Sequence, residues 1–91
     1  MLIRSQNKEA LLNFEKLSEI VIAGKENERC IAARDAHAAY LMGRYSSSKK
    51  SIKVLDEIQV AYQEFMSVKN DDAWLGQEAV FQMPQDSEVE V

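Results

Sequence analysis

Residues 46–68, SSSKKSIKVLDEIQVAYQEFMSV, decide the fold class of this 91-residue chain. Apolar side chains recur in this segment every three or four residues, which is the spacing of one buried face on an amphipathic helix. The residues of this expected face are Ile52, Leu55, Ile58, Tyr62 and Phe65, with Val54 and Ala61 beside them. We predict a helix over about residues 48–68, capped at its start by the hydroxyl of Ser47 or Ser48 and ended by the polar residues 70–72.

Short strands are expected before this helix. Residues 1–6 and 10–15 are apolar runs, and the polar sequence SQNKE between them favours a turn. Residues 18–23 form a β-branched run, which Gly24 and the polar sequence KENE close. Consecutive short strands with tight turns favour antiparallel neighbours.

The segment ENERCIAARDAHAAYLMGRY, residues 26–45, is the ambiguous part of the chain. Its alanines favour a helix, because alanine has the highest helix propensity. However, the apolar positions do not fall on one helical face, since Arg34, Asp35 and His37 interrupt them. We favour a hairpin that turns at residues 35–37, and a helix over residues 28–42 stays the alternative.

The chain closes with one more expected strand at residues 79–83, which Pro84 ends. The last residues, 85–91, are acidic and are expected to form a mobile tail. The pattern as a whole predicts an α+β fold in which a small antiparallel sheet of about four to six short strands packs against one long helix. Residues 1–84 would form this single domain.

Three stretches resemble a group of small uncharacterised proteins of Gram-positive bacteria and their phages or mobile elements. They are the start MLIRSQ, the junction GRYSSS at residues 43–48, and the closing MPQ at residues 83–85. The resemblance implies α+β architecture and a bacterial or mobile-element origin. It brings no established activity to this chain.

Composition limits the class of protein. Apolar residues make up 46% of the chain and charged residues 29%, which is typical of a globular domain. A lone cysteine, Cys30, excludes an internal disulfide framework. Charged residues interrupt the apolar runs, so we expect neither a signal peptide nor a membrane span, and we predict a cytoplasmic protein. The net charge of −4 opposes non-specific adsorption to nucleic acid.

Few residues suggest chemistry. Cys30 and His37 lie on or near opposite arms of the expected hairpin and could form a thiolate–imidazolium pair, but a buried thiol and a histidine in a turn explain them more simply. One histidine and one cysteine are too few for a closed zinc site. The glycines form no phosphate-binding loop. We therefore predict that the chain is not an enzyme and binds no cofactor or metal ion.

Two features suggest binding. Basic residues gather around the start of the expected helix, where free amides also favour an anion. This basic patch consists of Arg44, Lys49, Lys50 and Lys53. The second feature is Trp74, because tryptophan either packs onto a core or anchors a partner.

The functional hypothesis is a non-enzymatic protein–protein interaction module of bacterial or mobile-element origin. Its partner would be another protein or a second copy of the chain, with no role for a membrane. The alternative is a nucleic-acid-binding accessory or regulatory protein that uses the basic patch. Salt dependence separates the two, because phosphate contacts weaken steeply as salt rises.

Overall fold

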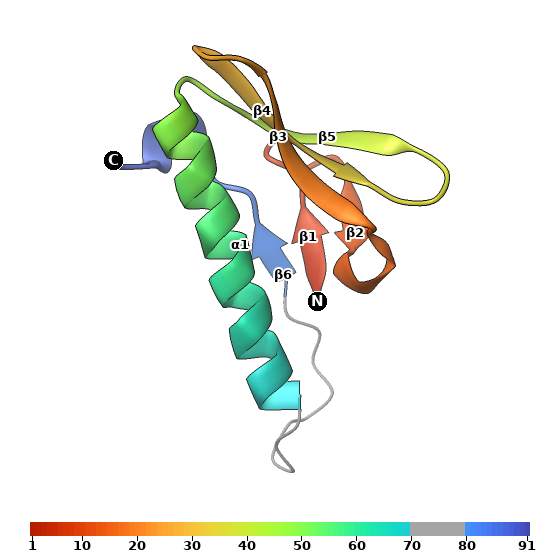
Figure 1. Ribbon diagram of the computed structural model, residues 1–91. Coiled ribbons are helices and arrows are strands. Elements are labelled where there is room, and N and C mark those ends of the chain that lie inside the picture. The colour runs from red at the N-terminus through yellow and green to blue at the C-terminus, as the bar shows by residue number, and fades with distance from the viewer. Residues whose placement is uncertain (70–79) are drawn as a thin grey trace.

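The computed structural model describes residues 1–69 and 80–91 (Figure 1). One long helix and six strands account for most of these residues. In chain order the elements are β1 (Leu2–Arg4), β2 (Leu11–Asn13), the short 3-10 helix η1 (Phe14–Lys16), β3 (Glu19–Lys25), β4 (Glu28–Arg34), β5 (Ala39–Tyr45), α1 (Ser48–Lys69), β6 (Val80–Gln82) and the short 3-10 helix η2 (Asp86–Glu88).

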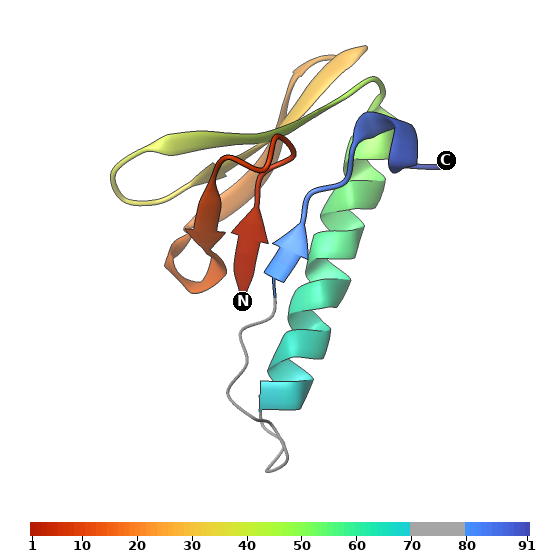
Figure 2. The same cartoon turned by 180° about the vertical axis from the view of Figure 1, so that it is seen from behind.

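The strands form two three-stranded sheets, with strand orders β3-β4-β5 and β2-β1-β6. The predicted α+β architecture, strands packed against one long helix, is confirmed. The larger sheet is antiparallel throughout, whereas β6 pairs parallel to β1. The sequence predicted only antiparallel neighbours. The parallel pair arises because the chain returns from the far end of α1 and therefore enters the small sheet in the direction of β1 (Figure 2).

The ambiguous segment is a hairpin, as favoured. β4 pairs antiparallel with β5 from Arg29 opposite Tyr45 to Arg34 opposite Ala39, with an irregularity between Ile31 and Ala32. The helical alternative is wrong for this segment. Ala32 and Ala33 lie on the central strand β4, where Ala33 is buried, and the other alanines of the segment are exposed in or near the turn.

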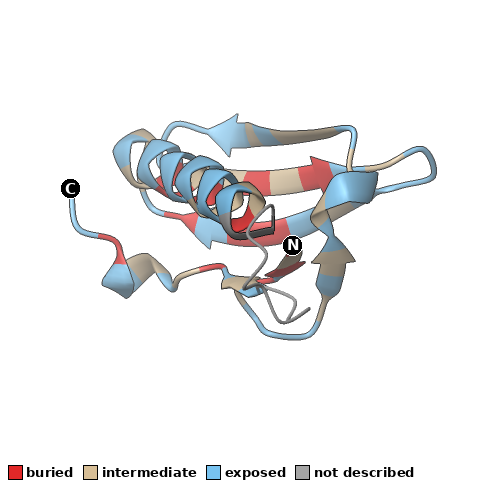
Figure 3. Cartoon of the chain, turned by 90° about the horizontal axis from the view of Figure 1, so that it is seen from below, coloured by how far each residue is buried: buried red, intermediate tan, exposed pale blue. Residues whose placement is uncertain are grey.

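The helix α1 crosses the larger sheet and buries one stripe against it. The buried positions are Ser51, Val54, Ile58 and Phe65. Figure 3 shows the buried parts of the strands gathered beneath the helix. The prediction that Ile52 belongs to this stripe is wrong, since its side chain is 52% exposed. The true stripe is rotated by one position toward Ser51, whose hydroxyl is satisfied by donating to the Ser48 carbonyl at 2.8 Å.

Both sheets and the helix share one core. The small sheet lies beneath the larger one, and β6 is its strand nearest α1 (Figures 1 and 2). The buried apolar residues come from β1, β4, β5 and α1 and from positions next to β1, β6 and η2. They are Met1, Ile3, Ile31, Ala33, Met42, Tyr45, Val54, Ile58, Phe65, Met83 and Val89. A chain of this length therefore spends most of its large apolar residues on one core.

The GRY sequence before the helix has a packing role. A Cβ atom at Gly43 would lie 3.0 Å from the Tyr45 hydroxyl, so the absence of a side chain there lets the Tyr45 ring lie along the strand. The buried Tyr45 hydroxyl donates a hydrogen bond to the Pro84 carbonyl at 2.8 Å. Burial raises the pKa of this phenol, which stays protonated and links β5 to the segment after β6.

Part of the C-terminal segment, residues 85–91, packs against the domain. Val89 is only 5% exposed and belongs to the core, and η2 sits beside the first turn of α1 (Figure 1). Residues on both sides of the predicted boundary after residue 84 therefore contribute to the same core. The mobility of residues 85–91 stays a prediction.

Two predicted features lie outside the described residues, namely the end of the helix at residues 70–72 and Trp74. Within the described part of the chain, no helix is both long enough and apolar enough to cross a membrane.

The position of the buried stripe can be tested with two matched substitutions on α1. Val54→Asp places a charge in the core and should lower the free energy of unfolding by about 4 kcal/mol or more. Ile52→Asp makes the same chemical change on the exposed side and should alter it by about 0.5 kcal/mol or less. Urea unfolding followed by circular dichroism measures both. Equal losses of unfolding free energy in the two variants would show that the buried stripe of α1 has been assigned to the wrong residues.

Candidate functional site

An apolar groove runs between α1 and the segment that leads into β3. It has a volume of about 520 Å³ and is open to solvent. Its walls come from η1, the start of β3 and the middle of α1. The apolar lining residues are Phe14, Leu17, Ile20, Leu55, Ile58 and Tyr62, and the polar ones are Ser18, Glu19, Gln59 and Gln63.

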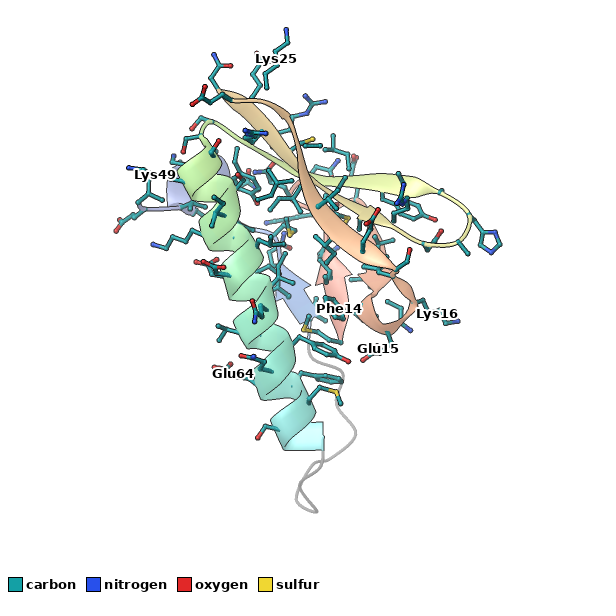
Figure 4. The ribbon with its side chains drawn as sticks, viewed as in Figure 1. Phe14, Glu15, Lys16, Lys25, Lys49 and Glu64 are labelled. Carbon is teal, nitrogen blue, oxygen red and sulfur yellow. The ribbon has the colours of Figure 1, made fainter. Side chains whose placement is uncertain are left out.

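Two of the rings that line the groove are stacked on each other. The Phe14 and Tyr62 ring centroids lie 4.3 Å apart with 28° between the ring planes, and the Tyr62 ring in turn lies 6.2 Å from that of Phe65. Phe14 points toward α1, whereas Lys16 of the same short helix points away from it (Figure 4). The Asn13 side chain fixes this turn by accepting a hydrogen bond from the Glu15 amide at 3.1 Å.

The groove has an apolar floor and a polar rim. Leu55 is half-buried and faces it, and Gln59 and Gln63 lie on the helix side of the rim. On the opposite rim, Glu19 forms an ion pair with Arg34 of the neighbouring strand. Such a lining suits apolar side chains whose backbone amides meet amide and carboxylate groups at the edges.

The groove also borders a strand edge. β3 pairs with β4 on one side and is an outer strand of its sheet. An outer strand presents backbone donors and acceptors to an approaching chain. This arrangement of groups can support the binding of an extended segment.

The predicted basic patch is assembled at the start of α1, but the C-terminal segment covers part of it. Lys50 Nζ donates to the Asp86 carbonyl at 2.9 Å and lies 3.5 Å from an oxygen of the Asp86 carboxylate. Lys53 Nζ donates to the Glu90 carbonyl. Arg44 and Lys49 are exposed, and Lys49 projects away from the domain (Figure 4).

The helix start holds a carboxylate from the chain itself. Asp86 Oδ1 accepts hydrogen bonds from the Ser46 amide at 2.8 Å and the Ser46 hydroxyl at 3.1 Å. The Ser47 hydroxyl accepts from the Lys50 amide at 3.2 Å, so Ser47 is the residue that caps the helix. The hydrogen bond from the Ser46 amide, helped by the Ser46 hydroxyl and Lys50, lowers the pKa of Asp86 below its ordinary value. The anion that the sequence led us to expect at this position is Asp86.

The structure places His37 in the exposed turn of the β4–β5 hairpin and Cys30 within β4, four residues before that strand ends. At about 3.3 Å per residue, this spacing separates the thiol from the turn along the strand. Asp35 organises the turn: its Oδ1 accepts from the His37 amide at 2.8 Å and the Ala38 amide at 2.9 Å. The backbone hydrogen bond from His37 is the main cause of the lowered pKa of Asp35.

Residues 1–69 and 80–91 contain no cluster of three His, Cys, Asp or Glu side chains that could hold a metal ion. The groove itself was not predicted. Its signal in the sequence was limited to Phe14 and to Leu55 at the side of the helix stripe, and nothing local to either residue indicates that they face each other. Comparisons with protein-family models, curated proteins and solved structures find no match.

The contacts of the Asp86 carboxylate with Ser46 and Lys50 give a pH-dependent prediction. Asp86→Ala should lower the free energy of unfolding at pH 7 by about 0.5–1 kcal/mol, since the carboxylate is partly exposed and its ion pair is screened. The native pKa of Asp86 is depressed, so its contribution is present above the ordinary pKa of about 3.9 and is lost as the pH falls through the native value. Urea midpoints of both proteins at neutral and acidic pH measure the difference.

The expected result is that the two proteins converge in stability toward low pH. Glu90→Ala is the control, because it removes an acid from the same segment while only the Glu90 backbone carbonyl contacts Lys53. A gap between wild type and Asp86→Ala that stays constant with pH would contradict the role given to the carboxylate.

The hairpin turn gives a second prediction. His37→Ala should change the free energy of unfolding by no more than about 0.5 kcal/mol, because the side chain is exposed. Asp35→Ala should be the more destabilising of the two, because it removes the acceptor for two turn amides and for the Tyr40 hydroxyl. Thermal unfolding of both variants measures the order. A larger loss for His37→Ala would mean that its imidazole has a structural partner.

Proposed function

We propose that this chain is a non-enzymatic protein–protein interaction module whose groove receives apolar side chains of a protein partner. The observation that carries the proposal is the apolar, solvent-open groove of about 520 Å³ between α1 and the start of β3. A partner segment that lies along it would bury Leu17, Leu55 and Tyr62. Apolar burial of this kind stabilises complexes by about 25 cal/mol per Å² before the cost of association is subtracted.

The adjoining strand edge adds directional contacts. A partner in extended conformation can pair with β3 while alternate side chains enter the groove, because successive side chains of a strand point to opposite sides. Gln59 and Gln63 on the other rim can donate to and accept from the same backbone. Bacterial or mobile-element origin and action in the cytoplasm are parts of this proposal that rest on the sequence and its resemblance.

The alternative, nucleic-acid binding through the basic patch, has less support. The segment after β6 already places Asp86 at the helix start and contacts the ammonium groups of Lys50 and Lys53. A nucleic-acid phosphate at this position would first have to displace an acidic segment. The same experiment tests both hypotheses, since they use different surfaces.

The test is affinity capture of tagged protein from a bacterial lysate with groove variants. Gln63→Trp places a large ring over the groove from an exposed position, and Leu55→Glu places a carboxylate inside it. Glu64→Trp is the matched control, because Glu64 is the next residue on α1 and projects away from the groove (Figure 4). We expect both groove variants to retain about tenfold less of a specific protein than wild type or Glu64→Trp, a loss equivalent to about 1.4 kcal/mol.

Salt and charge reversal complete the design. A specific protein partner should stay bound at high salt and tolerate reversal of Arg44, Lys49, Lys50 and Lys53 to glutamate. Nucleic acid that is held only at low salt and is lost on charge reversal would favour the alternative. A protein captured equally by wild type and both groove variants would overturn the role of the groove.

A further inference from the structure

The larger sheet has two outer edges, and the chain itself occupies one of them. At the outer edge of β5, the Gln6 amide donates to the Met42 carbonyl at 2.7 Å. The Gln6 side chain also exchanges two hydrogen bonds with the Arg44 backbone, each 2.9 Å long. At the other edge, among the residues that the structure describes, only β4 supplies hydrogen-bond partners to the backbone of Glu19–Lys25. The outer edge of β3 can therefore accept a further strand.

The sequence of β3, EIVIAGK, carries an acid at its first residue and a base at its last. Ile22 is the central residue of this strand. A twofold axis at Ile22 pairs two copies of β3 antiparallel and places Glu19 opposite Lys25 of the second copy. We propose that two copies of this chain form a dimer by joining these edges, so that the two larger sheets become one sheet of six strands.

The charges alternate in sign across the joined sheet. Within one chain, Arg34 of β4 lies opposite Glu19 and forms an ion pair with it, and Glu28 of β4 lies opposite Lys25. In the dimer, a row across four strands reads Arg34, Glu19, and then Lys25 and Glu28 of the second copy. The twofold axis repeats this row at the other end of the strands. Opposite charges on facing residues stabilise a strand pair, whereas like charges destabilise it.

These charges specify the direction and the register of the pair. A parallel pair in register would place Glu19 beside Glu19 and Lys25 beside Lys25 of the second copy. An antiparallel pair shifted by two residues would place Lys25 opposite Val21, or Glu19 opposite Ala23, and would lose both ion pairs. Only the pair centred on Ile22 gives each of these charges a partner of opposite sign.

The remaining base on the outer face of the sheet does not disturb this pairing. Arg44 lies on that face, opposite Cys30, and belongs to β5. Neighbouring strands are about 4.8 Å apart, so two strand spacings separate Arg44 from the joined edges. No residue of the second copy lies opposite Arg44 in the dimer.

The middle of the joined edge is apolar on both faces of the sheet. On the outer face, Val21 is 39% exposed and lies opposite Ala23 of the second copy. On the inner face, half-buried Ile22 lies opposite its own equivalent, and half-buried Ile20 lies opposite Gly24. Gly24 has a φ of 92°, and the ladder with β4 nevertheless continues through Lys25. Apolar contacts at the centre with charges at the rim are the usual anatomy of an interface.

This inference rests on the proposed function and deepens it, because it names a second copy as the protein that pairs with the edge of β3. Glu19 and Ile20 belong to both surfaces, since they also line the groove. Lys25 lies at the other end of β3, far from Phe14 of the groove (Figure 4). A substitution of Lys25 therefore tests the dimer without changing the lining of the groove.

Sedimentation of purified protein over a range of concentrations tests the proposal. Wild type should be a dimer, and Lys25→Glu should weaken self-association by about tenfold or more, because it places two acids opposite each other at both ends of the joined edge. Glu19→Lys should have the same effect by placing two bases opposite each other. An equimolar mixture of the two variants should restore the dimer, because positions 19 and 25 are both basic in one copy and both acidic in the other.

Two controls make the same charge changes outside β3. Lys49→Glu and Glu64→Lys alter exposed residues of α1 and should leave the dimer unchanged (Figure 4). Glu19→Lys also removes the ion pair with Arg34 inside one chain, so circular dichroism checks its fold.

Hydrogen exchange of backbone amides identifies the strand that pairs. The amides of Glu19–Lys25 that point away from β4 should exchange about tenfold or more slowly in the wild-type dimer than in Lys25→Glu at the same concentration, because they gain partners. The Arg44 amide should exchange at the same rate in both proteins, because the Gln6 side chain already accepts its hydrogen bond.

Three results would overturn the dimer. The first is a wild-type protein that sediments as a monomer at millimolar concentration, even if its groove still captures another protein. The second is a mixture of Glu19→Lys and Lys25→Glu that stays monomeric. The third is a dimer in which exchange from β3 is the same as in Lys25→Glu, which would place the interface on another surface. A captured protein that tolerates Gln63→Trp would instead overturn the groove and leave the dimer supported by sedimentation.

Discussion

The packing of α1 onto the central strand of the larger sheet is the contact on which the rest of the structure depends. Val54 and Ile58 of the helix share one core with Ile31 and Ala33 of β4. A helix of 22 residues is about 33 Å long, whereas a strand of seven residues spans about 23 Å. The helix therefore extends beyond the larger sheet, and the small sheet, η1 and the last residues pack along it. The groove is the part of its flank that these elements leave open.

Much of the fold could be predicted from the spacing of apolar residues along the sequence. A stripe with a spacing of three and four residues indicated the helix. Interruption of the apolar pattern at residues 34–37 favoured a hairpin there, with a second helix as the alternative. Rotation of the helix was harder to predict, because Ile52 and Val54 are equally apolar and only the neighbouring strands decide which is buried. The parallel pairing of β6 and the burial of Val89 depend on where the chain returns, which no local pattern encodes.

The candidate sites also differ in how far the sequence reveals them. The basic patch was visible because its residues are close in sequence, yet Asp86, which fills the helix start, lies 40 residues from Ser46. The groove was not visible, since Phe14 and Tyr62 come from distant segments and meet only through folding. For residues so far apart in the chain, the sequence shows only that each one is apolar or charged. Which of them contact each other is decided by the tertiary structure.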